Sequence, residues 1–295
     1  MAATIDLREH RSLQSELAGL DALESVLPPR PSLGRRIWAG VWPKALAAGI
    51  AVLFWQIVVW TGWKPEYVIP PPAKVFSRLY DDFGTIMDSV WITVQRAIDG
   101  YLLALVIGTA IGALVANNRV LRAGFASLIT GLMTMPSVAW VPLAIGMFGL
   151  SNATIRFIVI IGAAPSIANG LISGIDNIQP VIRRAGRVLG ARGWSAFRLV
   201  TLPAALPSFV GGMKQGWAFA WRSLLAAELI AVIAGKIGLG QLMENDRNFN
   251  DYTGVIAVMI VILVIGIIVD EAIFGNLNKW IRRRYGLVDE AASAK

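Results

Sequence analysis

The chain is 295 residues long, 56% hydrophobic and 16% charged, and carries a net charge of +8. A charged fraction this far below the roughly 25% of soluble domains excludes an ordinary soluble enzyme. The sequence has no cysteine and a single histidine, His10, so disulfides, thiolate nucleophiles and metal sites made of cysteine or histidine are excluded. The basic residues lie between long apolar runs, which favours a role in membrane orientation over contact with nucleic acid.

The apolar residues are concentrated in runs of membrane length. Uncharged stretches cover 45–63, 100–118, 123–155, 157–175, 199–213 and 252–269. A helix needs about 20 residues to cross a bilayer, whereas a buried strand needs only about 4–8. We therefore expect an all-α membrane protein with six transmembrane helices, at about 44–63, 90–116, 123–148, 154–175, 206–234 and 252–275.

Three segments outside these spans have characters of their own. Residues 1–43 are polar and contain a proline cluster, which is typical of a flexible tail. A proline run at 70–72 cannot be helical throughout, and the pattern after it predicts a short amphipathic helix at 73–87. The chain ends in a basic tail at 279–295.

The positions of lysine and arginine predict the orientation. One side of the membrane collects a set of basic residues in short loops: Arg30, Arg35, Arg36, Lys44, Arg119, Arg122, Arg183, Arg184, Arg187, Arg192, Arg198, Lys279, Arg282, Arg283 and Arg284. The fewer basic residues of the other side are diluted by acids. Because basic loops stay in the cytoplasm, both termini and the loop at 176–203 are expected there, in a bacterial inner membrane.

Two G-x-x-x-G patterns, Gly108 with Gly112 and Gly170 with Gly174, predict close helix packing. The pattern alone leaves open whether the partner helix belongs to the same subunit or to another one.

The cytoplasmic segment 180–203, here called the coupling segment, predicts a helix–turn–helix parallel to the membrane. Pro180 suits the first turn of a helix, and Val181, Ala185, Val188 and Leu189 form one apolar stripe. Gly190 and Gly193 allow a turn, and a second short helix follows that Pro203 is expected to limit. Either a partner protein or anionic lipid suits a surface of this kind.

The coupling segment resembles the signature cytoplasmic loop of permease subunits of bacterial ATP-binding-cassette (ABC) importers. That loop reads Glu-Ala-Ala, three residues, Gly, nine residues, Ile, one residue, Leu-Pro. The matching positions in this chain keep that spacing: Arg184, Ala185, Gly186, Gly190, Val200, Leu202 and Pro203. Arg184 replaces the glutamate and Gly186 replaces the second alanine, which puts the usual polar contacts of that glutamate in doubt.

The order of further motifs along 40–288 is similar to the nitrate/sulfonate/taurine permeases. These motifs are Ile69-Pro70-Pro71-Pro72, Pro142-Leu143-Ala144-Ile145, Ala226-Ala227-Glu228, Gly238-Leu239-Gly240 and the closing Arg282-Arg283-Arg284-Tyr285. The resemblance implies a homodimer with two cytosolic ATPase subunits and an extracytoplasmic solute-binding protein. It also favours a small oxyanion as the substrate, with aliphatic sulfonate or taurine first and nitrate or bicarbonate next, and it leaves heterocyclic vitamin precursors as an alternative, because similar permeases carry them.

Two ionisable residues lie within the fifth span, and two prolines within the third. Arg222 and Glu228 are about 240° apart around a helix, so each is expected to find a partner elsewhere. Arg222 suits an anion pathway or a helix contact, and Glu228 a gate or a structural ion pair. Pro136 and Pro142 are expected to interrupt the third span, and a helix broken in this way suits either the candidate translocation pathway or an ordinary kink.

No phosphate-binding G-x-x-x-x-G-K-[ST] loop is present. ATP chemistry must then belong to another chain, and this one is expected to be a transport subunit without cofactor or metal rather than an enzyme. The alternative is a secondary transporter driven by an ion gradient, which would favour inverted repeats and acids within the spans. The sequence shows no clear repeat, and Glu228 is the only acid deep in an expected span.

Overall fold

The computed structural model describes residues 33–233 and 235–285, and all regular structure in these ranges is helical. The chain divides into two compact units, and the described part of the first is the beginning of α2 (Leu33–Trp60), up to Leu53. Helix α2 starts within the tail expected at 1–43, because leucine, arginine and alanine extend helix formation ahead of the apolar run. The remainder of that tail lies outside the described residues.

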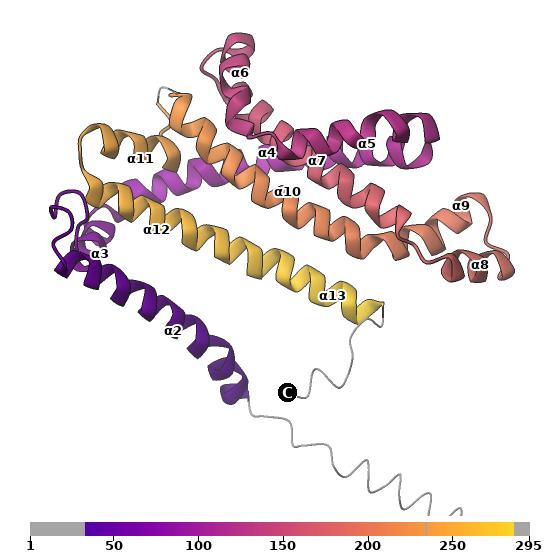
Figure 1. Cartoon of the computed structure of the whole chain (residues 1–295), viewed down its shortest axis with the longest axis horizontal. Helices are drawn as coiled ribbons and strands as arrows, with labels where there is room; N and C mark the ends of the chain where they lie inside the picture. Colours follow the sequence, from indigo (N-terminus) through magenta and orange to yellow (C-terminus); the bar gives the residue numbers. More distant parts are fainter. Residues whose placement is uncertain (1–32, 234, 286–295) are drawn as a thin grey trace, which may run out of the picture. The chain divides into compact units, whose positions relative to one another are not determined.

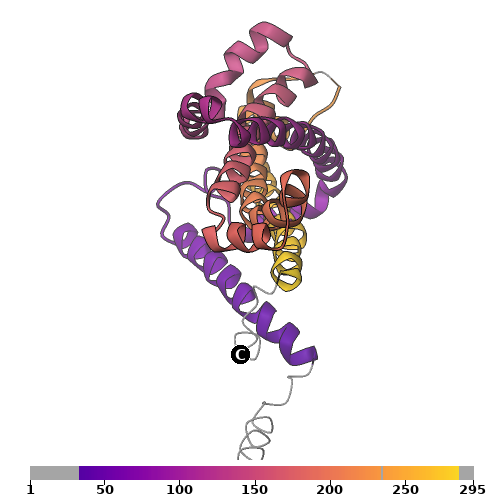
Figure 2. The same ribbon diagram turned by 90° about the vertical axis from the view of Figure 1, so that its right-hand side faces the viewer.

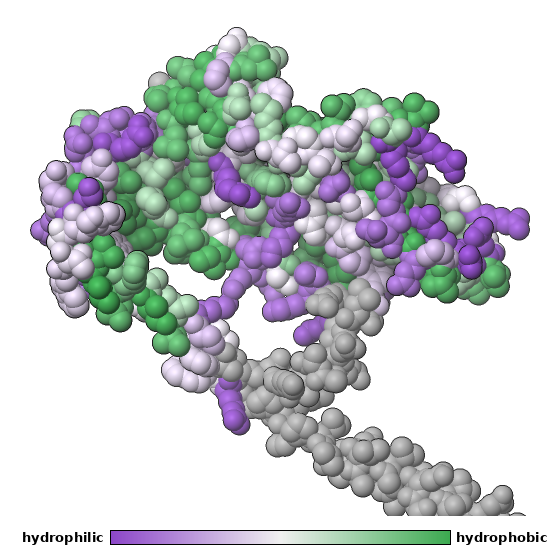
Figure 3. All heavy atoms as spheres, in the orientation of Figure 1, coloured by the Kyte–Doolittle hydropathy of each residue, from purple (hydrophilic) through white to green (hydrophobic). Residues whose placement is uncertain are grey.

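Among the described residues, five helical stretches are long and apolar enough to cross a bilayer: Gly40–Trp60, Phe83–Asn117, Asn152–Asp176, Gly193–Ile230 and Tyr252–Ile281. A bent pair of shorter helices, Arg119–Thr134 and Ser137–Phe148, would make a sixth span. The expected all-helical membrane fold is confirmed. In the second unit, hydrophilic side chains gather around α11 (Leu239–Asn248) at one end and around α8 (Pro180–Val188) and α9 (Gly193–Ala196) at the other (Figure 3).

The core of the second unit, Phe54–Leu287, is a group of three helices. Helix α7 (Asn152–Asp176) packs against both α4 (Phe83–Asn117) and α10 (Leu202–Ile230) (Figures 1 and 2). A Cβ on Gly108 would lie 2.6 Å from the carbonyl oxygen of Ala164, and one on Gly170 would lie 2.5 Å from Cα of Gly212. Both G-x-x-x-G pairs therefore serve helix packing within the chain.

The expected third span is sharply broken. Helix α5 (Arg119–Thr134) and the following η1 (Ser137–Trp140) and α6 (Val141–Phe148) meet at a bend of 99°. Met135 is extended, with φ −77° and ψ 127°, because the residue before a proline is disfavoured in the helical region. The break is thus at Pro136. Pro142, in contrast, lies in the first turn of α6 and does not interrupt a helix.

The remaining helices comprise the last span and two short helices at the ends of spans. They are α3 (Pro72–Asp81), α11, α12 (Tyr252–Val269), the π-helical η3 (Asp270–Gly275) and α13 (Asn276–Arg284). The amphipathic helix expected at 73–87 ends at Asp81, and α4 begins directly after Asp82. The helix that starts at Tyr252 continues to Arg284 through η3 and α13, so it enters the tail expected at 279–295, whose last ten residues lie outside the described ranges.

Candidate functional site

The coupling segment forms the expected helix–turn–helix. Pro180 occupies the first turn of α8, and Gly190 and Gly193 have φ values of +84° and +53°. Residues with a Cβ rarely adopt this left-handed conformation, which explains the two glycines. The second helix does not stop at Pro203. Instead α9, the π-helical η2 (Phe197–Thr201) and α10 form one continuous helix from Gly193 to Ile230. The π-helical turn lies directly before Pro203, where a regular α-helix would lack an N–H donor.

Two of the signature positions come together across the turn. A Cβ on Gly186 would lie 2.7 Å from Cγ2 of Val200, so glycine allows η2 to pack against α8. Gly186 is buried, whereas Arg184, Ala185 and Leu202 are exposed. Pro203 is half-buried in the first turn of α10. Gly186 and Val200 thus pack α8 against η2, whereas Arg184, Ala185 and Leu202 face outward.

The outward face of the coupling segment combines apolar and basic side chains. Val188 and Leu189 are each 87% exposed, and Trp194, which stacks on Phe197 with ring centroids 5.3 Å apart, is 73% exposed. Val181 and Ala185 of the predicted stripe are exposed as well. The same segment contains five arginines and no acidic residue: Arg183, Arg184, Arg187, Arg192 and Arg198. Large apolar residues this exposed are the mark of a contact surface.

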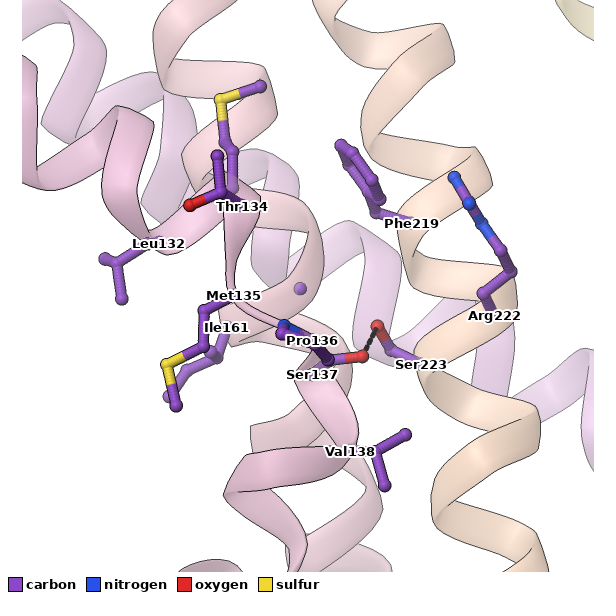
Figure 4. Close-up of a pocket in the computed structure, with 12 residues that line it drawn as sticks. Leu132, Thr134, Met135, Pro136, Ser137, Val138, Ile161, Phe219, Arg222 and Ser223 are labelled. Atoms are coloured by element: carbon purple, nitrogen blue, oxygen red, sulfur yellow. Dashed lines mark hydrogen bonds between the residues drawn. The ribbon is translucent and has the colours of Figure 1, made fainter.

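Arg222 lies at a cavity between α10 and the break of the third span. The cavity has a volume of about 270 Å³ and is lined by Thr134, Met135, Pro136, Ser137, Val138, Phe219, Arg222 and Ser223, among others (Figure 4). The Arg222 Nε donates to the carbonyl oxygen of Ala218 at 3.1 Å, and its guanidinium lies 5.0 Å from the centre of the Phe219 ring. These are contacts within one helix, so the partner expected on another helix is not observed.

Two hydroxyls face each other at the same cavity. Ser223 of α10 donates to Ser137 of η1 over 2.7 Å, and this bond joins the fifth span to the broken third span. In Figure 4 these two side chains point toward one another, while Phe219 and Arg222 extend from α10 in a common direction. The structure therefore brings Pro136 and Arg222 to one cavity, whereas Pro142 does not line it.

Glu228 has the partner on another helix that the sequence predicted. Its Oε1 accepts from Nη1 of Arg96 in α4 at 2.8 Å, and its Oε2 accepts from the Thr93 hydroxyl at 2.9 Å. Glu228 is completely buried and Arg96 is 9% exposed. The backbone N–H of Gly240 completes the set at 3.1 Å from Oε2. A buried carboxylate requires such a full set of donors.

The sequence analysis missed Arg96. The signal was present, since Arg96 lies within the expected span 90–116, and an ionisable residue at membrane depth marks a site in the same way as Glu228 does. The spacing of Thr93 and Arg96, three residues apart on one helix face, gave a second indication.

Comparisons with known proteins identify the family. Residues 104–283 match the family described as the binding-protein-dependent transport system inner membrane component. The chain belongs to this family. It is 31% identical over 230 residues to a putative ABC transporter permease protein of Methanocaldococcus jannaschii, which covers 76% of this chain and 85% of that protein.

Two further relatives carry more specific names. A bicarbonate transport system permease protein of Synechococcus elongatus is 28% identical over 245 residues, covering 79% of this chain and 86% of that protein. A putative aliphatic sulfonates transport permease protein of Bacillus subtilis is 26% identical over 263 residues, covering 88% and 93%. The chain is therefore a multi-pass permease subunit of an ABC transport system, and it is not itself an enzyme.

The family match covers most of the candidate site. It includes the coupling segment, the cavity at Arg222 and the carboxylate of Glu228, but it begins after Thr93 and Arg96. The family match thus contains Glu228 but not its ion-pair partner Arg96.

Proposed function

We propose that this permease acts as a homodimer and translocates a small oxyanion, handed over by an extracytoplasmic binding protein and driven by ATP hydrolysis on separate cytosolic subunits. The permeases named for bicarbonate and for aliphatic sulfonates, to which the chain is similar, both carry substrates with negatively charged oxygens. The observation that carries the proposal is the polar face of α10, on which Arg222 lies.

That face runs along the length of the fifth span. A set of exposed residues recurs every three or four positions and so lies on one side of the helix: Ser208, Gly211, Gln215, Ala218 and Arg222. The opposite side packs on α7, where a Cβ on Gly216 would lie 2.7 Å from Ile167. A surface turned to lipid is apolar, and ionisable groups at membrane depth face protein or water. The exposed face of α10 is therefore suited to line an aqueous pathway between two subunits.

The guanidinium of Arg222 is suited to bind a passing oxyanion. Its Nε donates to the carbonyl oxygen of Ala218, and its guanidinium carbon lies 5.0 Å from the centre of the Phe219 ring. The two terminal nitrogens then present the paired donors that match the oxygens of a carboxylate, sulfonate or similar anion. The serine hydroxyls of Ser137 and Ser223 add neutral donors in the same cavity.

The coupling segment is the proposed docking surface for the ATPase. The distribution of basic residues supports a cytoplasmic location for this segment and for both termini. Its exposed Val188, Leu189 and Trp194 supply apolar contacts, and the arginines around them supply charge. Because α9 continues without a break into α10, a displacement of the docked segment moves the pathway helix directly. The ATPase then biases the equilibrium between two arrangements of that helix.

Arg222→Gln tests the pathway. A charge-assisted hydrogen bond contributes about 1.5–3 kcal/mol, so uptake at low substrate concentration should fall at least about tenfold. Arg222→Lys keeps the charge and should lose less. Normal dimer assembly with lost uptake supports the pathway role, whereas unchanged uptake by Arg222→Gln would refute it.

Gly190→Trp tests the docking surface. The left-handed φ of Gly190 does not suit a residue with a Cβ, so the variant should lose co-purification with the ATPase. Gly124→Trp is the control, because a Cβ on this glycine of α5 meets nothing within 4 Å. A Gly190→Trp variant that still binds and couples to the ATPase would contradict docking at this segment.

A further inference from the structure

The continuous helix Gly193–Ile230 connects two distant structural features. It has 38 residues, which at 1.5 Å per residue gives a length of about 57 Å, more than the thickness of a bilayer. Its first turns belong to the coupling segment, and its last two turns contain Glu228. In the proposed orientation, one continuous helix therefore joins the cytosolic docking surface to the extracytoplasmic side of the permease.

At that far end, Glu228 and its partners hold the backbone of the segment Lys236–Gly240. Nη2 of Arg96 donates to the carbonyl oxygen of Lys236 at 3.1 Å. The hydroxyl of Thr93 accepts from the backbone N–H of Leu239 at 2.7 Å while it donates to Glu228. Three backbone groups of this segment, those of Lys236, Leu239 and Gly240, are thus bonded to three side chains of α4 and α10.

The same junction also includes α7. Nε of Arg96 donates to Oδ1 of Asn152, at the first turn of α7, over 3.1 Å. Arg96 therefore bonds to α7, to α10 through Glu228 and to the segment Lys236–Gly240, with one nitrogen directed at each. The arrangement of α4, α7, α10 and the segment Lys236–Gly240 thus satisfies all three of these hydrogen bonds at once.

Two glycines let the segment approach the carboxylate. A Cβ on Gly238 would lie 2.2 Å from Oε1 of Glu228, and one on Gly240 would lie 2.7 Å from Cβ of Glu228. The motif Gly238-Leu239-Gly240 is thus explained by contact with Glu228 rather than by a turn.

A buried ion pair is a poor device for stability alone. Replacing both partners by apolar residues of similar volume is often neutral, whereas removing one partner leaves an uncompensated buried charge. The ion pair instead fixes one relative position of α4, α10 and the segment Lys236–Gly240. These elements can therefore be held together or released together.

We propose that Arg96 and Glu228 form a latch that transmits movement of α10 to the segment Lys236–Gly240 and so opens and closes the extracytoplasmic mouth. They are positioning residues for transport rather than contacts of the substrate. The inference rests on the proposed function, because it takes the ATPase to act on the other end of α10. Displacement of that helix then carries Glu228, and with it the three bonded backbone groups of the segment.

The chain offers a direct probe of this movement. It has no cysteine, and Ile237, within the latched segment, is 41% exposed. An Ile237→Cys variant, assembled with its ATPase in nanodiscs, would be labelled with a maleimide with and without a non-hydrolysable ATP analogue. Allosteric couplings are typically about 5–150-fold, so nucleotide should change the labelling rate of Ile237→Cys by at least about fivefold.

The deciding variant replaces both partners, Arg96→Met with Glu228→Leu, in the Ile237→Cys background. We expect it to bind the ATPase as the parent does, to lose most of the nucleotide dependence of labelling, and to lose uptake while ATP hydrolysis continues. Full nucleotide dependence with normal uptake would show that the pair is only structural and overturn the proposal. ATP-independent uptake by the parent protein would defeat the proposed function instead, so the two failures are distinguishable.

Thr93→Val provides a second test that keeps both partners of the ion pair. It removes the hydroxyl that joins Glu228 to Leu239 and keeps the volume of the side chain. The nucleotide effect on labelling should shrink at least about twofold in this variant. Thr130→Val is the matched control, because the Thr130 hydroxyl is exposed and donates only to the carbonyl oxygen of Ala126 in its own helix. Equal behaviour of Thr93→Val and the control would overturn the latch, including in a case where the double variant fails to assemble.

Discussion

Two adjacent glycines of α10 give a sharp test of how the core is packed. A Cβ on Gly212 would lie 2.6 Å from Cα of Gly170, whereas a Cβ on Gly211 meets nothing within 4 Å. Gly212→Ala must therefore push α10 away from α7, and Gly211→Ala need not move anything. Overpacking costs about 1–3 kcal/mol, and replacing a helical glycine by alanine returns about 0.5–1 kcal/mol. The net loss for Gly212→Ala lies between about 0 and 2.5 kcal/mol, and the middle of the two ranges gives about 1–2 kcal/mol.

That loss can be measured by following tryptophan fluorescence on heating in detergent, since the chain contains 11 tryptophans. At about 2–4 °C per kcal/mol, the melting temperature of Gly212→Ala should fall by about 2–8 °C. That of Gly211→Ala should stay unchanged or rise by up to about 4 °C. Equal shifts in the two variants would refute the close crossing of α7 and α10.

Two further predictions concern the ends of the spans. Gly186→Ala should weaken ATP-driven uptake, because its Cβ would meet Val200 at 2.7 Å, and adding Val200→Ala should restore it; no rescue would contradict this packing. On α11, burial and the neighbouring Asp251 raise the pKa of Asp246 despite the opposing charge of Arg78. A carboxyl whose pKa is raised by folding binds its proton more tightly in the folded state than in the unfolded state. The folded state therefore loses stability as the pH rises above the ordinary pKa of the carboxyl group. The melting temperature of Asp246→Asn relative to the parent should therefore increase from about pH 4 to about pH 7, and a constant difference would count against it.

The parts of the structure that depend on local sequence patterns could be predicted. The membrane helices follow from the length of the apolar runs, and the helix–turn–helix at 180–203 follows from Pro180 and two glycines. The break of the third span follows from Pro136, because a proline constrains both itself and the preceding residue. In each case one local property of the chain decides the structure.

The details that depend on packing could not be predicted. Pro142 and Pro203 have the same covalent constraint as Pro136, yet Pro142 lies in the first turn of α6 and Pro203 lies within the continuous helix Gly193–Ile230, directly after the π-helical η2. Whether a proline starts or breaks a helix depends on which N–H is already unpaired.

The same limit applies to the charged groups. Glu228 was expected to need a partner elsewhere, but only the fold shows that this partner is Arg96, 132 residues earlier in the chain. Arg222, six residues earlier on the same helix, contacts only Ala218 and Phe219 among the described residues and faces a cavity instead. The sequence marks both residues as costly in a membrane, and only the arrangement of the helices separates a structural contact from a pathway group.

The most direct test of the proposed function is the energy source of uptake. The permease, its ATPase and its binding protein would be reconstituted in proteoliposomes, and uptake of radiolabelled bicarbonate or an aliphatic sulfonate measured with ionophores that collapse all ion gradients. We predict uptake that requires ATP inside the cytosolic-facing compartment, persists with the ionophores and is lost in Gly190→Trp. Uptake that proceeds without ATP and disappears with the ionophores would contradict the account and favour a secondary transporter.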